Sequence, residues 1–117
     1  MLTPDDIRRV AIAFPEVEES LHFGQPKFAV RAKAFAGTEK GGRTAVFSVS
    51  QEEAAAAVAA EPEVYEEVWR TAARPTWVGL RVDLAAVSRE RVAELAEHAW
   101  RNRAPKRLVA AYDAARP

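Results

Sequence analysis

The residues best suited to chemistry lie close together, in residues 18–28. Ser20, His22 and a neighbouring carboxylate, Glu18 or Glu19, are the residue types of a nucleophile, a general base and an acid that orients the base. In enzymes with such a triad the base normally comes from another part of the fold. Nothing in this segment resembles a strained nucleophile turn or an oxyanion hole. We therefore predict that the protein is not an enzyme and has no catalytic residues.

The same segment can be explained by the backbone that it has to form. Glu19 and Ser20 can fix a turn through hydrogen bonds, and Gly24 can adopt conformations closed to other residues. Pro26 forces the residue before it into an extended conformation at the entry to a strand. A structural role is thus predicted for Glu19, Ser20, His22, Phe23, Gly24 and Pro26.

Metal and thiol chemistry find little support in the composition. The chain has no cysteine, which excludes a disulfide framework, a thiolate zinc site and a cysteine nucleophile. His22 and His98 are its only histidines, and His98 lies in a predicted helix with Glu94 one turn earlier. We expect neither a bound metal nor a cofactor.

Local signals place residues 18–28 between a helix and a sheet. Thr3 is a suitable N-cap for a first helix that Pro15 ends, so the segment should connect this helix to the first strand. Residues 27–31 alternate with a period of two, which predicts a half-buried strand. Two glycines at 41–42 then predict a hairpin that joins residues 33–38 to residues 44–49.

The second half of the chain follows the same logic. A capping box at Ser50 predicts a helix to about residue 60, followed by a short acidic and aromatic connector. Residues 77–83 read as a strand, and a long C-terminal helix should bury Trp100 and break near Pro105. Such a chain of 117 residues fits a single domain over residues 1–117.

Trp77 could belong to a binding surface. Strict alternation turns Val78, Leu80 and Val82 toward the core and leaves Trp77, Gly79 and Arg81 in a row on the opposite face. A stacking plane beside a cation suits single-stranded nucleic acid or another planar ligand. The alternative is that Trp77 packs beneath a loop or against a neighbouring strand.

The charges of the chain balance overall but not locally. Its 17 basic and 17 acidic side chains give no net charge, whereas domains that bind nucleic acid electrostatically are usually basic. Residues 27–49 nevertheless carry five basic side chains and one acidic one, and residues 70–117 carry ten and five. Such blocks form either solvated faces or a basic patch.

Three segments resemble the signatures of the MmcQ/YjbR family, in the same order and over nearly the whole chain. They are residues 18–28, Trp77-Val78-Gly79 and residues 104–108. The resemblance implies an α+β domain similar to the CyaY (frataxin-like) fold, in which an antiparallel sheet has helices packed on one side. The family is usually labelled DNA-binding, because its hairpins suggest a double-wing arrangement.

Two functional hypotheses follow from these observations. The first is a DNA-binding domain that contacts its ligand through Arg31, Lys33, Lys40, Arg43, Trp77, Arg81, Lys106 and Arg107. The second is a non-enzymatic adaptor that binds a protein or a small ligand with the sheet face around Trp77. The sequence has no window approaching the ~20 apolar residues of a membrane span and no basic, apolar leader, so we expect a cytoplasmic protein. We also expect a monomer.

Overall fold

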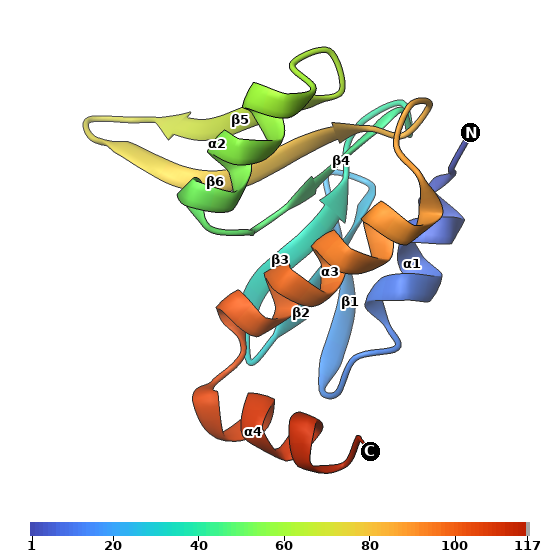
Figure 1. Cartoon of the computed structure of the whole chain (residues 1–117), viewed down its shortest axis with the longest axis vertical. Coiled ribbons are helices and arrows are strands. Elements are labelled where there is room, and N and C mark those ends of the chain that lie inside the picture. Colours follow the sequence, from blue (N-terminus) through green and yellow to red (C-terminus); the bar gives the residue numbers. More distant parts are fainter. Residues whose placement is uncertain (117) are drawn as a thin grey trace.

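The computed structural model describes residues 1–116, which form one six-stranded antiparallel sheet and four helices (Figure 1). The strands are β1 (Val17–His22), β2 (Gln25–Val30), β3 (Lys33–Thr38), β4 (Thr44–Phe47), β5 (Tyr65–Thr71) and β6 (Pro75–Asp83). The helices are α1 (Pro4–Ala11), α2 (Gln51–Ala60), α3 (Arg89–Arg103) and α4 (Lys106–Ala114).

The sheet combines a four-stranded meander with a separate hairpin. Its strand order is β1-β2-β3-β4-β6-β5, so the β5–β6 hairpin joins the meander through the pairing of β4 with β6. Helices α1 and α3 contact the meander, and α2 contacts the hairpin, on one face of the sheet (Figure 1). The predicted two-layer α+β architecture is therefore confirmed. Within residues 1–116, no helix has both the length and the apolar character needed to cross a bilayer.

Trp100 holds three of the helices together. Its side chain in α3 is fully buried, stacks on Phe14 just after α1 at 5.6 Å between ring centroids, and meets Tyr112 of α4 edge-on at 5.0 Å. Its indole Nε1 also donates a hydrogen bond of 3.1 Å to the carbonyl oxygen of Pro15. The predicted core position of Trp100 is confirmed, and so is the break between α3 and α4 at Pro105.

Two segments that the sequence predicts to be connectors are strands at the edges of the sheet. Residues 17–22 form β1, and residues 65–71 form β5. Both edges expose carboxylates, Glu18 and Glu19 on β1 and Glu66 and Glu67 on β5. Because an edge strand is paired on one side only and is solvated over most of its length, it needs little of the apolar alternation by which strands are detected.

A binding groove on the open face of the sheet

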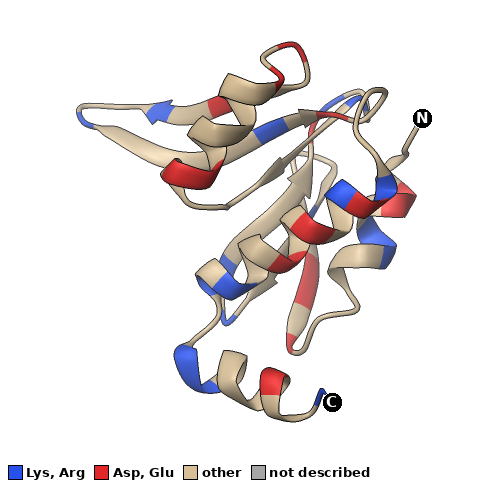
Figure 2. Ribbon diagram, viewed as in Figure 1, with Lys and Arg blue, Asp and Glu red and all other residues tan. Residues whose placement is uncertain are grey.

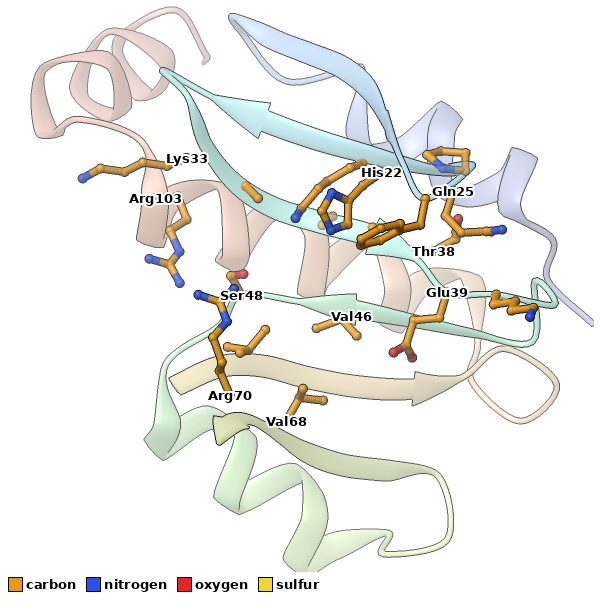
Figure 3. Close-up of a pocket in the computed structure, with 18 of the residues that line it drawn as sticks. His22, Gln25, Lys33, Thr38, Glu39, Val46, Ser48, Val68, Arg70 and Arg103 are labelled. Atoms are coloured by element: carbon orange, nitrogen blue, oxygen red, sulfur yellow. The ribbon is translucent and has the colours of Figure 1, made fainter. Parts of the chain in front are cut away.

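The face of the sheet that the helices leave uncovered is concave. Side chains from β2 to β6, together with the β1–β2 turn, line a groove of about 660 Å³ across it (Figure 3). This volume falls within the range of roughly 300–1,000 Å³ that is typical of ligand pockets. The groove is therefore the leading candidate for a binding site.

The floor of the groove is apolar and low. It includes Ala34, Gly37, Val46 and Val68, side chains that all end close to the backbone. Gly37 pairs with Val46 across β3 and β4, so a residue without a side chain faces a short one at the centre of the sheet. Small residues therefore line the middle of the open face.

Cations dominate the walls of the groove. Five basic side chains and a single carboxylate, that of Glu39, line it. Within residues 1–116 none of the five basic side chains forms an ion pair. We call them the groove cations: Lys27, Lys33, Lys40, Arg70 and Arg103.

Three of the groove cations gather at one end. Lys33 at the start of β3, Arg70 near the end of β5 and Arg103 at the end of α3 lie at the same end, where the Arg70 and Arg103 side chains extend toward each other (Figure 3). The Nε of Arg103 is buried and has no hydrogen-bond partner within residues 1–116. An unsatisfied buried donor is costly unless an acceptor reaches it.

The carboxylate in the groove is already neutralised. Arg81 donates hydrogen bonds of 2.7 and 2.9 Å to the two carboxylate oxygens of Glu39, and it also contacts Glu66 on β5. Thr44 donates a further hydrogen bond of 2.7 Å to Glu39. The hydrogen bonds from Arg81 hold the pKa of Glu39 below its ordinary value, although partial burial opposes them. Glu39 therefore stays ionised and tied to Arg81.

Replacing Glu39 with glutamine should flatten the loss of stability in acid. A carboxyl group whose pKa is lowered by folding contributes stability above its unfolded pKa, here about 4.5, and this contribution is lost as the pH falls through the lower folded value. Thermal unfolding of wild type and Glu39→Gln should thus converge below about pH 4.5. The control is Glu63→Gln, because Glu63 is exposed and forms no ion pair within residues 1–116. Equal pH profiles for the two variants would contradict the assignment.

The basic residues predicted to contact DNA do not all lie in the groove. Lys33 and Lys40 line the groove. Arg31 lies in the β2–β3 turn and forms an ion pair with Glu16, while Arg81 is held by Glu39 and Glu66. The remaining basic positions are exposed but do not line the groove: Arg43 in the β3–β4 turn, and Lys106 and Arg107 at the start of α4.

The predicted outward row of Trp77, Gly79 and Arg81 is interrupted between Trp77 and Gly79. Val68 pairs with Gly79 but Trp69 pairs with Trp77, so β6 has one extra residue, Val78, at a β-bulge. The bulge breaks the alternation, and Val78 lines the groove. Trp77 packs against a loop and a neighbouring strand, as the alternative interpretation has it, and it also lines the groove.

The indole of Trp77 is engaged by that packing. Its Nε1 donates a hydrogen bond of 2.8 Å to the carbonyl oxygen of Val49, in the loop before α2. The ring packs edge-on against Trp69 of β5, with 5.1 Å between the ring centroids. Trp77 still borders the groove, but it is half-buried and held by these two contacts.

Several groove residues were not predicted as contacts. Lys27 belongs to the predicted strand, and its position opposite the buried Phe28 could have identified it. Arg70 belongs to β5, which the sequence did not reveal, and Arg103 reaches the groove only because α3 ends beside β3. Phe23, predicted to be structural, lies in the β1–β2 turn and also lines the groove.

Acidic and basic residues are concentrated in different parts of the molecule. Carboxylates lie along β1 and α2, whereas basic residues are concentrated where α3 ends and α4 begins (Figure 2). Within residues 1–116, no group of three or more histidine, aspartate or glutamate side chains is arranged to hold a metal ion.

The fold and the groove define a two-layer α+β domain with a binding surface on the open side of its sheet. Residues 12–102 match the YjbR family, and the chain belongs to that family. A similar solved structure is protein DR2400 of Deinococcus radiodurans, described as a DUF419 domain. It shares 22% identity with a TM-score of 0.70 over 86% of this chain and 77% of its own, which establishes a common fold. Among curated proteins no match is found.

Proposed function

We propose that this YjbR-family domain binds single-stranded nucleic acid, DNA in the first instance, in the open-face groove and without catalysing a reaction. The observation that carries the proposal is the set of groove cations, five basic side chains without ion-pair partners within residues 1–116, around an apolar floor. The cations can bind the phosphates of a strand, and its unpaired bases can pack on the apolar floor.

The distribution of charge explains how a neutral chain can favour a polyanion. The carboxylates Glu39 and Glu66 are bound by Arg81, so they do not compete for the groove cations. The positive potential is therefore local, and the neutral total reflects acidic residues elsewhere. A duplex would present its phosphates but not its bases, and it would leave the apolar floor unused.

The adaptor hypothesis has less support. It places the contact with a protein or small ligand on the sheet face around Trp77, whose indole is bonded to Val49 and packed on Trp69, and it gives no role to the groove cations. A small anionic ligand could occupy the same groove. The dependence of affinity on the length of the nucleic acid separates it from a strand.

Salt dependence tests the proposal. A fluorescent oligothymidylate of about twelve nucleotides should bind in a fluorescence anisotropy titration, a length within the site sizes of single-strand-binding folds. If about four phosphates are contacted, log affinity should fall with log salt concentration with a slope of roughly −3. Lys27→Gln combined with Arg70→Gln should weaken binding at low salt at least about tenfold and bring the slope to roughly −1.5.

The matched control removes two cations from the opposite face. Arg9 of α1 and Arg89 of α3 lie on exposed parts of the helical layer, so Arg9→Gln with Arg89→Gln should leave affinity and slope unchanged. Binding that is undetectable at low salt, or an affinity that does not respond to salt, would exclude the proposal. An equal loss in the control pair would show that the groove is not the site.

A further inference from the structure

We propose that Phe23 stacks on an unpaired nucleobase at the margin of the groove, so that the β1–β2 turn is a base-stacking platform. This inference rests on the proposed function and adds the chemical group that the apolar part of the site recognises. A nucleic-acid strand and a free nucleotide both offer this group, a nucleobase next to a phosphate, and the experiment below distinguishes them.

Phe23 does not contribute to the hydrophobic core. Its side chain is 93% exposed, more than any other large apolar side chain of residues 1–116, and it lines the groove. A buried phenylalanine is explained by packing, but packing cannot explain this one. The side chain is available to a ligand.

The backbone makes phenylalanine an unfavourable choice at this position. His22 pairs with Gln25, so Phe23 and Gly24 are the two central residues of a tight turn, with φ values of +50° and +79°. Two positive φ values are the mark of a type I′ turn, in which asparagine followed by glycine is preferred. A phenylalanine there is strained by its Cβ. Strain without compensating packing is typical of functional positions.

The neighbours of Phe23 fit a nucleotide. His22 meets the Phe23 ring edge-on, with 4.5 Å between the ring centroids, and supports the orientation of that ring. His22 and Lys27 share the open face, because Lys27 lies two residues beyond Gln25, the partner of His22. A base on Phe23 would therefore have a cation nearby for its phosphate. This combination of aromatic ring and cation favours nucleic acid over an apolar protein segment.

The test is Phe23→Asn, which removes the ring while giving the turn its preferred residue. Its melting temperature should equal or exceed that of wild type, because the strain is relieved. Its affinity for the oligothymidylate should fall roughly 5- to 150-fold, the range that loss of one base–aromatic stack produces. The salt slope should not change, because no charge is lost. Phe23→Trp should retain binding.

Leu21→Asn is the matched control, since Leu21 is 72% exposed on the same strand but alternates to the other side of it. It should bind like wild type. A twelve-base-pair duplex should bind more weakly than the single strand and should not respond to Phe23→Asn, because its bases are already stacked.

The outcomes separate this inference from the function on which it rests. Salt-dependent binding that Phe23→Asn leaves intact would overturn the stacking and keep the proposed function. Absence of salt-dependent binding in wild type would overturn the function itself. A lower melting temperature of Phe23→Asn would contradict the strain and overturn the inference. If thymidine monophosphate binds as tightly as the oligomer and depends on Phe23, stacking stands, but the ligand is a free nucleotide and not a strand.

Discussion

Replacing Trp100 with alanine is expected to lower the free energy of unfolding by about 3–5 kcal/mol, the usual cost of removing a buried tryptophan. Trp100 is fully buried and contacts Phe14 and Tyr112, and its indole bonds to the carbonyl oxygen of Pro15. The substitution therefore opens a cavity, leaves that carbonyl without its donor, and removes one of the contacts that hold α4. No neighbouring side chain can replace all three of these contacts after the substitution.

Urea unfolding followed by circular dichroism measures this effect. Trp69→Ala is the control, because Trp69 is 39% exposed and, within residues 1–116, its indole Nε1 donates a hydrogen bond to Glu67 on the same strand. The control should cost less than Trp100→Ala, since Trp69 already exposes 39% of its surface, whereas Trp100 exposes none. A loss below about 1 kcal/mol for Trp100→Ala would show that the helices are held by other contacts.

The second large effect is expected from Gly79→Ala, at the junction of β4 and β6. A Cβ at this position would lie 2.5 Å from the carbonyl oxygen of Phe47 and 3.1 Å from a methyl carbon of Val46. The first contact is with backbone, which cannot rotate away as a side chain can. We expect a loss of about 3 kcal/mol, the upper part of the range for overpacking.

Gly37→Ala is the control for that prediction. Gly37 also lies in the sheet, but the atom nearest to its Cβ would be the carbonyl oxygen of Pro26 at 3.4 Å, an ordinary contact. Its unfolding free energy should change by less than about 1 kcal/mol. Because Val46 lies in the groove floor, Gly79→Ala should also weaken oligothymidylate binding in the protein that remains folded. Equal stabilities of the two alanine variants would contradict the close approach of β4 and β6.

The parts of the fold that could be predicted have strong local signals. The cap at Thr3 and the cap at Ser50 both place helix starts correctly, because each side-chain oxygen accepts a backbone N–H of the first turn. The two glycines at 41–42 have the positive φ values that the predicted hairpin turn needs. These features depend on residues within a few positions of one another, so a single sequence contains them in full.

The parts that were missed depend on partners distant in the sequence. β1 is a strand because β2 lies beside it, although its residues are polar and exposed. The bulge at Val78 shifts the register of Trp77 relative to Leu80. A prediction from strict alternation cannot detect such an inserted residue. A second register shift follows Phe28, where β2 meets β3. Strand alternation is therefore reliable only between such irregularities.

The candidate site was predicted in type but not in composition. Basic residues at a sheet were expected, and Lys33 and Lys40 do line the groove. Arg81 was expected to face a ligand, but it forms an ion pair with Glu39. The two residues are 42 positions apart, so the sequence gives no local signal for this pair. Whether a cation is free or paired depends on three-dimensional neighbours, and so does the position of Arg103 at the end of α3.

The acidic edges of the sheet restrict how the domain can meet other molecules. Unpaired backbone groups of β1 and β5 are open to strand addition by another chain, but each edge carries two exposed glutamates. A second copy approaching edge to edge would bring like charges together, which opposes aggregation through the sheet. Two of these glutamates, Glu18 and Glu67, form no ion pair within residues 1–116, so they add unneutralised negative charge at the two edges. The charges of the two edges thus disfavour pairing through β1 and β5, and they leave the open face with its groove as the surface that a negatively charged strand can approach.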